Sequence, residues 1–411
     1  MINVHAVTRR LPLLAIAAAM ALAVLGPASA SAGGRNHGDD HGKGHDHGHH
    51  GKGHHNDGHH HDGNHGKGHD HGRHHGSEVS VMTRNLYLGA VLDPAVEAES
   101  PEELAAADGE ILREVVANDF PTRAKGLASE ILRTRPDLVG LQEVALWQST
   151  PLSASATPVN YDYLELLLNQ LNKGHGTPYR VVEVQKEFDL EAPADMNEVP
   201  GDGPLPGFPT AELLGHLTMR DVILARNGVH TWDAEGANFG TLLELPILGQ
   251  LKPIARGWTA TDARVGNSGP FHFVNTHLES FNPLIRQAQA DELVAPGGPA
   301  TGGLPVVLVG DLNSDDDTVS GADTLAYDDL LAAGLVERST DDPLGCCLNS
   351  AFLSVGGGGM PSDFNHQVDH VMTNDPSDIT LRYSLVTGLN PVNGFWDSDH
   401  AGLFSSLNFD D

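Results

Sequence analysis

Asparagine, carboxylate and histidine side chains stand at the ends of apolar segments along the chain after residue 76. They are Asn85 in TRNLYL, Glu143 in GLQEV, His277 in VNTHLES, Asp311 and Asn313 in VGDLNS, and Asp399 and His400 in SDH. A further carboxylate, Asp369 in QVDHV, interrupts the interior of an apolar strand pattern. Strand ends converge at one edge of a sheet, which is where α/β folds place their sites. We therefore expect these side chains to meet.

This combination of side chains suits the hydrolysis of a phosphodiester. The reaction needs an activated water, neutralisation of charge on the phosphoryl oxygens and help for the leaving oxygen. A hard cation such as Mg²⁺ prefers oxygen ligands, and Asn85 and Glu143 offer an amide oxygen and a carboxylate. A histidine oriented by a carboxylate can accept the proton of the water or stabilise negative charge.

Each of these residues also has a plainer interpretation when it is taken singly. Asn85 suits a turn, Glu143 suits a solvated strand end, and 311–313 suits turn chemistry before a helix. His277 suits a hydrogen-bonded core position. Asp369 fits such an interpretation poorly, because a carboxylate inside an apolar strand is costly without a partner. Taken together, so many polar residues on apolar segments favour one common site.

In chain order, the motifs N…LQE…NTHL…GDLNS…VDH…SDH resemble those of the endonuclease/exonuclease/phosphatase superfamily, from about Val81 to Leu407. The resemblance implies an α/β fold, a four-layer sandwich of two packed mixed β-sheets flanked by helices. It also implies a metal-dependent phosphoric ester hydrolase that uses Mg²⁺, Mn²⁺ or Ca²⁺. The segments RDVILAR, RGW and FVNTHLE and the paired cysteines look like a bacterial secreted branch of this superfamily.

The same resemblance implies a role for each matching residue. The implied metal ligands are Asn85, Glu143 and Asp399, and the implied catalytic residues are His400, Asp369, His277, Asp311 and Asn313. His400 is expected to pair with Asp369 and to act on the water or on the pentavalent state. Asp311 and Asn313 are expected to position the nucleophile and the phosphate, and His277 is expected to serve the leaving group.

The spacing of apolar residues predicts the elements that carry these motifs. Predicted strands cover 78–85, 138–144, 179–184, 221–225, 271–278, 305–312 and 367–372, and predicted helices cover 101–116, 121–136, 161–171, 283–293 and 327–333. The segment 193–209 is rich in Pro, Gly and Asp and is predicted to be a surface loop. Strands and helices interleave without a strict βαβ rhythm, which indicates mixed sheets.

The N-terminal part of the chain is expected to lie outside this fold. Arg9 and Arg10, an apolar run and small residues up to Ala30 are typical of a signal peptide. The run of about 15 residues is short for a ~30 Å hydrocarbon core. We therefore expect 1–32 to be a leader, with an uncleaved anchor as the less favoured alternative, and the protein to be secreted without a stable membrane anchor.

Residues 33–76 hold most of the 25 histidines and no aromatic or large aliphatic residue. Such a segment cannot bury apolar surface, so we expect a disordered arm. Clustered imidazoles bind Zn²⁺ or Ni²⁺, and the alternative is a solubilising tether. Residues 77–411 are predicted to form one catalytic domain, acting as a monomer.

The charge of the chain bears on its substrate. With 24 Lys and Arg against 55 Asp and Glu, the formal net charge is −31, which repels nucleic acid and anionic membranes at long range. A phosphoester substrate, whether nucleic acid or a phospholipid headgroup, therefore needs local cations, and a bound divalent metal supplies them. The apolar segment 239–258 would suit a sphingomyelinase, and a phosphomonoesterase would need a basic pocket. A non-catalytic metal-binding or surface-interaction protein on the same scaffold is the alternative.

Arg220 and the two cysteines are further features of the sequence. Arg220 precedes a predicted strand and suits either a phosphate contact or a surface ion pair. Cys346 and Cys347 are the only cysteines and are adjacent. Neighbouring Cα atoms lie about 3.8 Å apart, below the usual disulfide range, so an ordinary structural disulfide within the chain is not expected. The redox state of the pair is not predicted.

Overall fold

The computed structural model describes residues 77–409 except 175–177, 200–202, 204, 317–322, 341–343, 351–352, 354–357, 375–376 and 393. The predicted leader, 1–32, and the predicted histidine-rich arm, 33–76, lie outside the described residues. Among the helices that are described, none has the length and apolarity needed to cross a membrane.

The larger sheet has eight strands in the order β15-β16-β1-β2-β6-β3-β4, with β5 paired to β6. Its strands are β1 (Ser77–Asn85), β2 (Leu138–Gln142), β3 (Leu146–Pro151), β4 (Tyr161–Asp162), β5 (Tyr179–Ala194), β6 (Leu213–Arg226), β15 (Ile379–Thr387) and β16 (Gly402–Phe409). β1 and β2 run parallel, whereas β1 is antiparallel to β16 and β2 is antiparallel to β6. The carboxyl ends of β1 and β2 therefore lie side by side.

The smaller sheet has six strands in the order β13-β14-β12-β11-β10-β7. Its strands are β7 (His230–Asn238), β10 (Gly257–Arg264), β11 (Phe271–His277), β12 (Val306–Asp311), β13 (Val336–Glu337) and β14 (Asp369–Thr373). β11 and β12 are parallel, and β14 is antiparallel to β12. A separate hairpin, β8 (Leu243–Ile247) and β9 (Gln250–Ile254), lies within the apolar segment 239–258.

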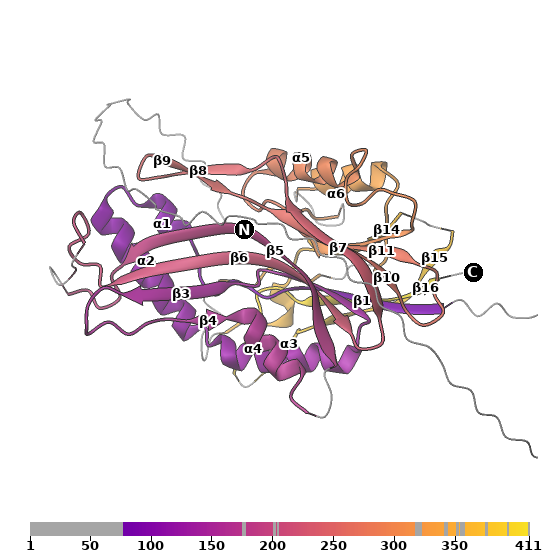
Figure 1. The fold of residues 1–411 in the computed structure, drawn as a ribbon, viewed down its shortest axis with the longest axis horizontal. Helices are drawn as coiled ribbons and strands as arrows, with labels where there is room; N and C mark the ends of the chain where they lie inside the picture. The colour runs from indigo at the N-terminus through magenta and orange to yellow at the C-terminus, as the bar shows by residue number, and fades with distance from the viewer. Residues whose placement is uncertain are drawn as a thin grey trace, which may run out of the picture. The chain divides into compact units, whose positions relative to one another are not determined.

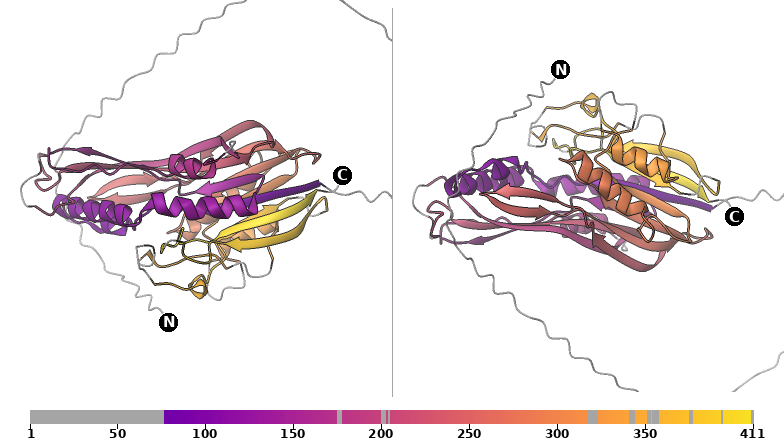
Figure 2. Two further views of the ribbon diagram at one scale, coloured as in Figure 1. Left: turned by 90° about the horizontal axis from the view of Figure 1, so that it is seen from below. Right: turned by 90° about the horizontal axis from the view of Figure 1, so that it is seen from above.

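The two sheets pack face to face, and helices cover their outer faces (Figures 1 and 2). The helices are α1 (Asp93–Glu97), α2 (Pro101–Ala117), α3 (Phe120–Thr134), α4 (Tyr163–Leu171), α5 (Pro283–Val294), α6 (Leu325–Ala332) and the 3₁₀ turn η2 (Pro361–Asp363). Ser100 begins α2 by accepting a hydrogen bond from the backbone N–H of Glu103, with Pro101 in the first turn. The predicted α/β sandwich is confirmed.

Three apolar clusters hold the four layers together. Alternate residues of β12 face opposite ways: Val307 and Val309 belong to the cluster between the sheets, whereas Val306 and Leu308 pack under α5 and α6. A third cluster lies between the larger sheet and α2, α3 and α4. Because β12 is buried on both faces, its sequence begins with a continuous apolar run at 306–309.

Several elements differ from the sequence-based prediction. β5 and β6 are longer than the predicted strands 179–184 and 221–225. The prediction was too short because polar residues occupy the exposed parts of both strands and hide the apolar pattern. Residues 161–162 form a short strand before α4. Asp369 begins β14 instead of interrupting its interior, which brings its side chain to the sheet edge where β12 ends.

Candidate active site

The strand registers bring most of the predicted site residues to one edge of the sandwich. In the larger sheet Asn85 pairs with Gln142 at the ends of parallel β1 and β2, and Glu143 follows directly. In the smaller sheet His277 pairs with Asp311 at the ends of parallel β11 and β12. Asp369, at the start of antiparallel β14, pairs with Asp311 as well.

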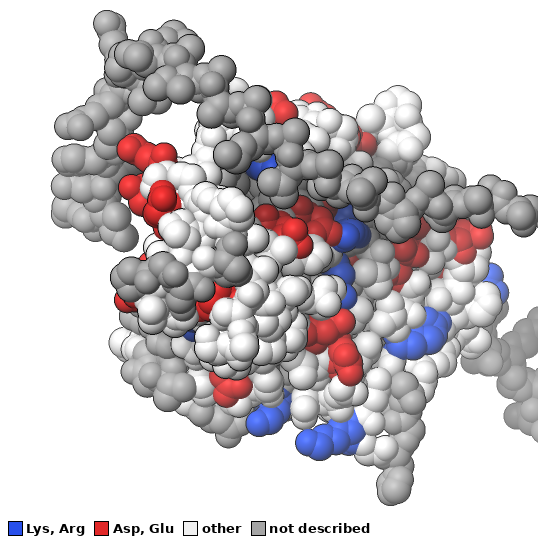
Figure 3. Space-filling view, turned by 60° about the vertical axis from the view of Figure 1, so that its left-hand side comes forward, with Lys and Arg blue, Asp and Glu red and all other residues white. Residues whose placement is uncertain are grey.

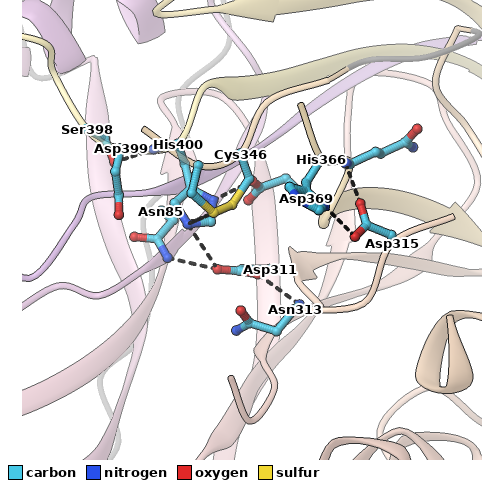
Figure 4. The surroundings of a disulfide bond; sticks show 12 residues. Asn85, Asp311, Asn313, Asp315, Cys346, His366, Asp369, Ser398, Asp399 and His400 are labelled. Atoms are coloured by element: carbon cyan, nitrogen blue, oxygen red, sulfur yellow. Dashed lines mark hydrogen bonds and ion pairs between the residues drawn. A yellow bond between two sulfur atoms is a disulfide. The ribbon is translucent and has the colours of Figure 1, made fainter. Parts of the chain in front are cut away.

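One carboxylate oxygen, Oδ2 of Asp311, is the meeting point of three side chains. Nδ2 of Asn85 donates a hydrogen bond to it at 2.9 Å, Nε2 of His277 lies 3.5 Å away, and Nε2 of His400 lies 3.6 Å away. Figure 4 shows Asn85, Asp311 and His400 pointing toward one another. Burial raises the pKa of Asp311, while the charge of His400 opposes that rise.

His400 is held by a buried carboxylate. Its Nδ1 lies 2.7 Å from Oδ2 of Asp369, and both residues are buried. Burial alone would lower the pKa of His400, but the charges of Asp369, Asp311 and Asp399 raise it well above its ordinary value. The imidazole is therefore oriented with Nε2 toward Asp311.

Arg84, a residue for which the sequence suggested no role, fixes the main chain of His400. Nη1 of Arg84 donates to the carbonyl of His400 at 2.5 Å and to the carbonyl of Asn85 at 3.1 Å. Its Nη2 forms a 3.0 Å ion pair with Glu130 on α3. One buried guanidinium thus ties the end of β1 to the segment that carries His400.

Glu143 stands in a left-handed backbone conformation, with φ 54°, directly after β2. The backbone N–H of Leu88 donates to its Oε2 at 2.6 Å. Burial, followed by the charge of Asp399, raises the pKa of Glu143 to about 7. A left-handed conformation is uncommon for a residue with a side chain and marks positions that the surrounding structure enforces.

Arg220 holds the loop that follows Glu143 in its conformation. Its Nε donates to the carbonyl of Val144 at 2.9 Å, and its Nη2 donates to Asp162 at 2.7 Å and to the carbonyl of Ala145 at 3.3 Å. Of the two alternatives open for Arg220, the structure supports the ion pair. The guanidinium supports the loop carrying Glu143 instead of facing a substrate.

The donor set near Glu143 fits a hard divalent cation. Asp399 interacts electrostatically with Glu143, and burial raises the pKa of Asp399 as well. The charge of Asp399 raises the proton affinity of Glu143, and these two carboxylates with the amide oxygen of Asn85 offer the oxygen ligands that a hard cation prefers. Asp311, Asp369 and His400 also place ligand atoms within 4.8 Å of one another.

His277 is fixed on its far side by Arg256, which had no predicted role. Nη1 of Arg256 lies 3.0 Å from Nδ1 of His277, and the same guanidinium is 3.7 Å from Glu187. Burial, followed by the charge of Arg256, lowers the pKa of His277 well below its ordinary value. Burial and the positive charge of Arg256 thus favour the neutral form of the imidazole. Arg256 precedes β10 directly, and the sequence carried no signal for this contact.

Asn313 is also in a left-handed conformation, with φ 49°. Its backbone N–H donates to Oδ1 of Asp311 at 2.9 Å, and its Nδ2 donates to the carbonyl of Leu278 at 3.0 Å. The local turn at 311–313 thus holds the carboxylate of Asp311, and the side-chain amide of Asn313 lies beside the end of β11.

Cys346 and Cys347 form a disulfide, and both sulfur atoms lie against His400. Nε2 of His400 is 3.7 Å from Sγ of Cys346 and 3.8 Å from Sγ of Cys347. The sequence did not predict this neighbourhood, because more than fifty residues separate the cysteines from His400.

Acidic and basic side chains are distributed unevenly over the surface. On the face shown in Figure 3, acidic side chains gather in several groups, and the basic side chains form small groups between them. This surface agrees with the formal net charge of −31.

One family model and several solved structures are similar to this chain. The family model for the endonuclease/exonuclease/phosphatase family matches residues 114–400, more than half of the chain. Similar solved structures include an endonuclease/exonuclease/phosphatase family protein from Bacteroides thetaiotaomicron, with 15% identity, a TM-score of 0.49, and coverage of 82% of this chain and 99% of that one. A mannosyl-6-phosphatase from the same organism has 16% identity and a TM-score of 0.46, covering 80% of this chain and 100% of its own.

Truncated TDP2 from Caenorhabditis elegans has 16% identity and a TM-score of 0.43, covering 80% of this chain and 97% of its own. The search of curated proteins found no match. The span of the family model, on a sandwich whose strand ends carry the motifs in order, leads to one conclusion: the chain belongs to the endonuclease/exonuclease/phosphatase family.

Proposed function

We propose that this protein is a secreted, divalent-metal-dependent phosphoesterase that hydrolyses a phosphodiester, as a nuclease or a phospholipase-C-like enzyme does. The observation that carries the proposal is the pair formed by Nδ1 of His400 and Oδ2 of Asp369, 2.7 Å apart, with Nε2 of His400 facing Asp311. A buried, oriented imidazole beside a second carboxylate suits proton transfer at a phosphoryl centre.

Asn85, Glu143 and Asp399 would hold the cation. Their oxygen atoms match the preference of Mg²⁺, Mn²⁺ and Ca²⁺, and the raised pKa values of Glu143 and Asp399 are what a site awaiting a positive charge would show. When bound, the cation neutralises charge on the phosphoryl oxygens. In a protein of net charge −31, such local positive charge is what would hold an anionic substrate.

The protein's own groups divide the remaining work. The 3.6 Å between Nε2 of His400 and Oδ2 of Asp311 is too long for a direct hydrogen bond, so both groups remain able to bind one atom between them. We assign that place to the attacking water or a phosphoryl oxygen. Asp369 keeps Nδ1 of His400 protonated, so that Nε2 is the nitrogen that exchanges a proton with the reacting group.

His277 serves the other side of the phosphoryl group. Arg256 occupies its Nδ1, so its proton is on Nε2, which points toward Asp311. A neutral imidazole with a fixed N–H is a hydrogen-bond donor for a phosphoryl or leaving oxygen. Asn313 supports this arrangement by holding Asp311 through its backbone N–H.

A substrate panel tests the proposal. The purified full chain would be incubated with Mg²⁺, Mn²⁺ or Ca²⁺ and plasmid DNA, RNA, sphingomyelin or bis-p-nitrophenyl phosphate. The proposal expects hydrolysis of at least one diester, loss of the activity with a chelator and its recovery on adding back the metal. Silence on every diester with every metal would contradict it and would favour a non-catalytic protein on this scaffold.

A further inference from the structure

The cysteine pair lies against the imidazole nitrogen that the proposed reaction uses. Both sulfur atoms are within 3.8 Å of Nε2 of His400, while Nδ1 is occupied by Asp369. Cys346 is buried, whereas Cys347, whose sulfur also lies beside His400, is an exposed residue. The pair is therefore open to reagents in solution and next to a catalytic candidate.

Backbone hydrogen bonds hold the cysteine loop in place on both sides. The backbone N–H of Ala401 donates to the carbonyl of Gly345 at 2.6 Å, and that of Leu348 donates to the carbonyl of Asp399 at 2.9 Å, so the two bonds bracket His400. On the other side, the backbone N–H of Cys346 donates to the carbonyl of His366 at 3.0 Å. This clamping does not depend on the bond between the sulfurs, so the loop is expected to stay against His400 when that bond is open.

We infer that the reduced Cys346–Cys347 pair and Nε2 of His400 form an inhibitory binding site for a thiophilic divalent cation, with Zn²⁺ as the best match. Zn–S bonds of about 2.3 Å and Zn–N bonds of about 2.0–2.1 Å in a tetrahedron separate sulfur from nitrogen by roughly 3.5 Å. The observed separations are 3.7 and 3.8 Å. The three ligand atoms lie within 4.8 Å of one another, and opening the disulfide lets the sulfurs move apart.

Opening the disulfide between Cys346 and Cys347 requires a two-electron reductant. A phosphine takes an oxygen from water and becomes a phosphine oxide, and the disulfide takes the two electrons and two protons to give two thiols. Zn²⁺ then replaces the two thiol protons and the proton on Nε2 of His400, and these three protons go to solvent. Nδ1 of His400 keeps its bond to Asp369, an arrangement that strengthens imidazole as a metal ligand.

The consequence for activity rests on the proposed function, whereas the binding itself does not. With Nε2 of His400 bound to zinc, the imidazole has no free nitrogen for the reacting group. The disulfide form therefore keeps His400 free, and the reduced form loses activity when zinc is present. Disulfide formation thus protects the enzyme against zinc at this place.

Cobalt(II) tests the binding without any assay of activity. The full chain is reduced with a phosphine, desalted without oxygen and titrated with Co²⁺, and the near-ultraviolet thiolate-to-cobalt charge-transfer absorption is recorded. Because the chain has two cysteines and no others, this absorption reports only the proposed site, whatever the histidine-rich segment binds. The controls are the untreated disulfide protein and the variant Cys346→Ser/Cys347→Ser. The inference expects the absorption to saturate at the intensity of one thiolate-bound Co²⁺ per reduced chain, to be displaced by Zn²⁺ and to be absent from both controls. A reduced protein without it would overturn the inference.

Zinc inhibition is then measured on a substrate from the panel. For each protein, reduced and unreduced, the rate with Zn²⁺ is divided by the rate of the same protein without Zn²⁺. Reduction is expected to lower this ratio roughly tenfold or more in the wild type, because the imidazole is blocked, and to leave it unchanged in the double-serine variant. Equal ratios for reduced and disulfide protein would contradict the inhibitory role even if cobalt binds. Since the absorption needs no turnover, failure of the proposed function leaves the binding test intact.

Discussion

Nη1 of Arg256 lies 3.0 Å from Nδ1 of His277. A guanidinium can only donate, so Nδ1 of His277 accepts and the imidazole proton must be on Nε2. That nitrogen lies 3.5 Å from Oδ2 of Asp311, toward the proposed phosphoryl position. Arg256 is therefore a positioning residue that selects the tautomer of His277.

Without the guanidinium of Arg256, the proton of His277 is no longer restricted to Nε2. Arg256→Met is expected to lower kcat on the order of 10²-fold with little change in KM, because the other tautomer would present a lone pair to Asp311 and the substrate. Arg256→Lys retains a donor and should recover most of kcat. Steady-state kinetics with thermal melting of both variants check this. A Lys variant as inactive as the Met variant, with both folded, would contradict tautomer control.

Loss of the carboxylate that pairs with His400 should lower kcat more than loss of a carboxylate that pairs with another histidine. Asp369→Asn is expected to lower kcat by about 10²–10⁴-fold, since the imidazole loses its orientation and the charge that favours its protonated form. A matched control exists on the same sheet, where Nδ1 of His272 lies 2.7 Å from Oδ1 of Asp262. Asp262→Asn should stay within about twofold of wild type. Equal losses in the two variants would mean that the effect is one of general stability.

Glu143 is expected to lower the stability of the metal-free protein and to be required for metal binding. Its charge is buried beside Asp399, so Glu143→Gln is expected to stabilise the chelated protein on the order of 1–3 kcal/mol at pH 8. The same change should abolish the stabilisation by Mn²⁺, which in wild type is about 2.7 kcal/mol at 100 times Kd. Chemical denaturation with and without Mn²⁺ measures both effects, with exposed Glu191→Gln as the control. A normal Mn²⁺ response in Glu143→Gln would exclude Glu143 as a ligand.

Asp108 on α2 gives a prediction about pH and stability. Burial raises its pKa from 3.8 to about 7, and its Oδ2 has no hydrogen-bond partner among the described residues. Because the folded pKa is above the unfolded one, the ionised carboxylate destabilises the fold. The penalty is absent below about pH 4, grows up to about pH 7 and is constant above it.

Asp108→Asn should therefore raise Tm by several degrees at pH 8, about 2–4 °C for each kcal/mol regained, and change it little at pH 4. Thermal melts at the two pH values check this, with the exposed Glu110→Gln on the same helix as the control. A Tm gain of equal size at both pH values would show that ionisation of Asp108 is not its cause.

The sequence predicted the location of the site because the chemistry-bearing residues follow apolar strands. Asn85, His277 and Asp311 end their strands, and parallel pairing then forces those ends together. The layer order follows from the same apolar runs. The strands β15 and β16 were not predicted, because polar residues, including the buried Ser405 and Ser406 of β16, interrupt the apolar pattern.

The supporting contacts could not be predicted, since they join residues far apart in the chain. Arg84 binds the carbonyl of His400 across more than three hundred residues, and Arg256 reaches His277 from the position just before β10, the strand that pairs with β11. The position of Cys346 beside His400 depends on a loop pairing with segments on both of its sides. No local pattern in the sequence encodes such meetings.

The most direct test of the central claim is the rate at which His400→Ala hydrolyses the best diester of the panel with Mn²⁺. The half-exposed His216, which pairs with Asp189, supplies the matched control His216→Ala. The proposed mechanism predicts that His400→Ala loses at least about 10²-fold in kcat while remaining folded, and that His216→Ala keeps the wild-type rate. A His400→Ala protein with the wild-type rate would contradict it.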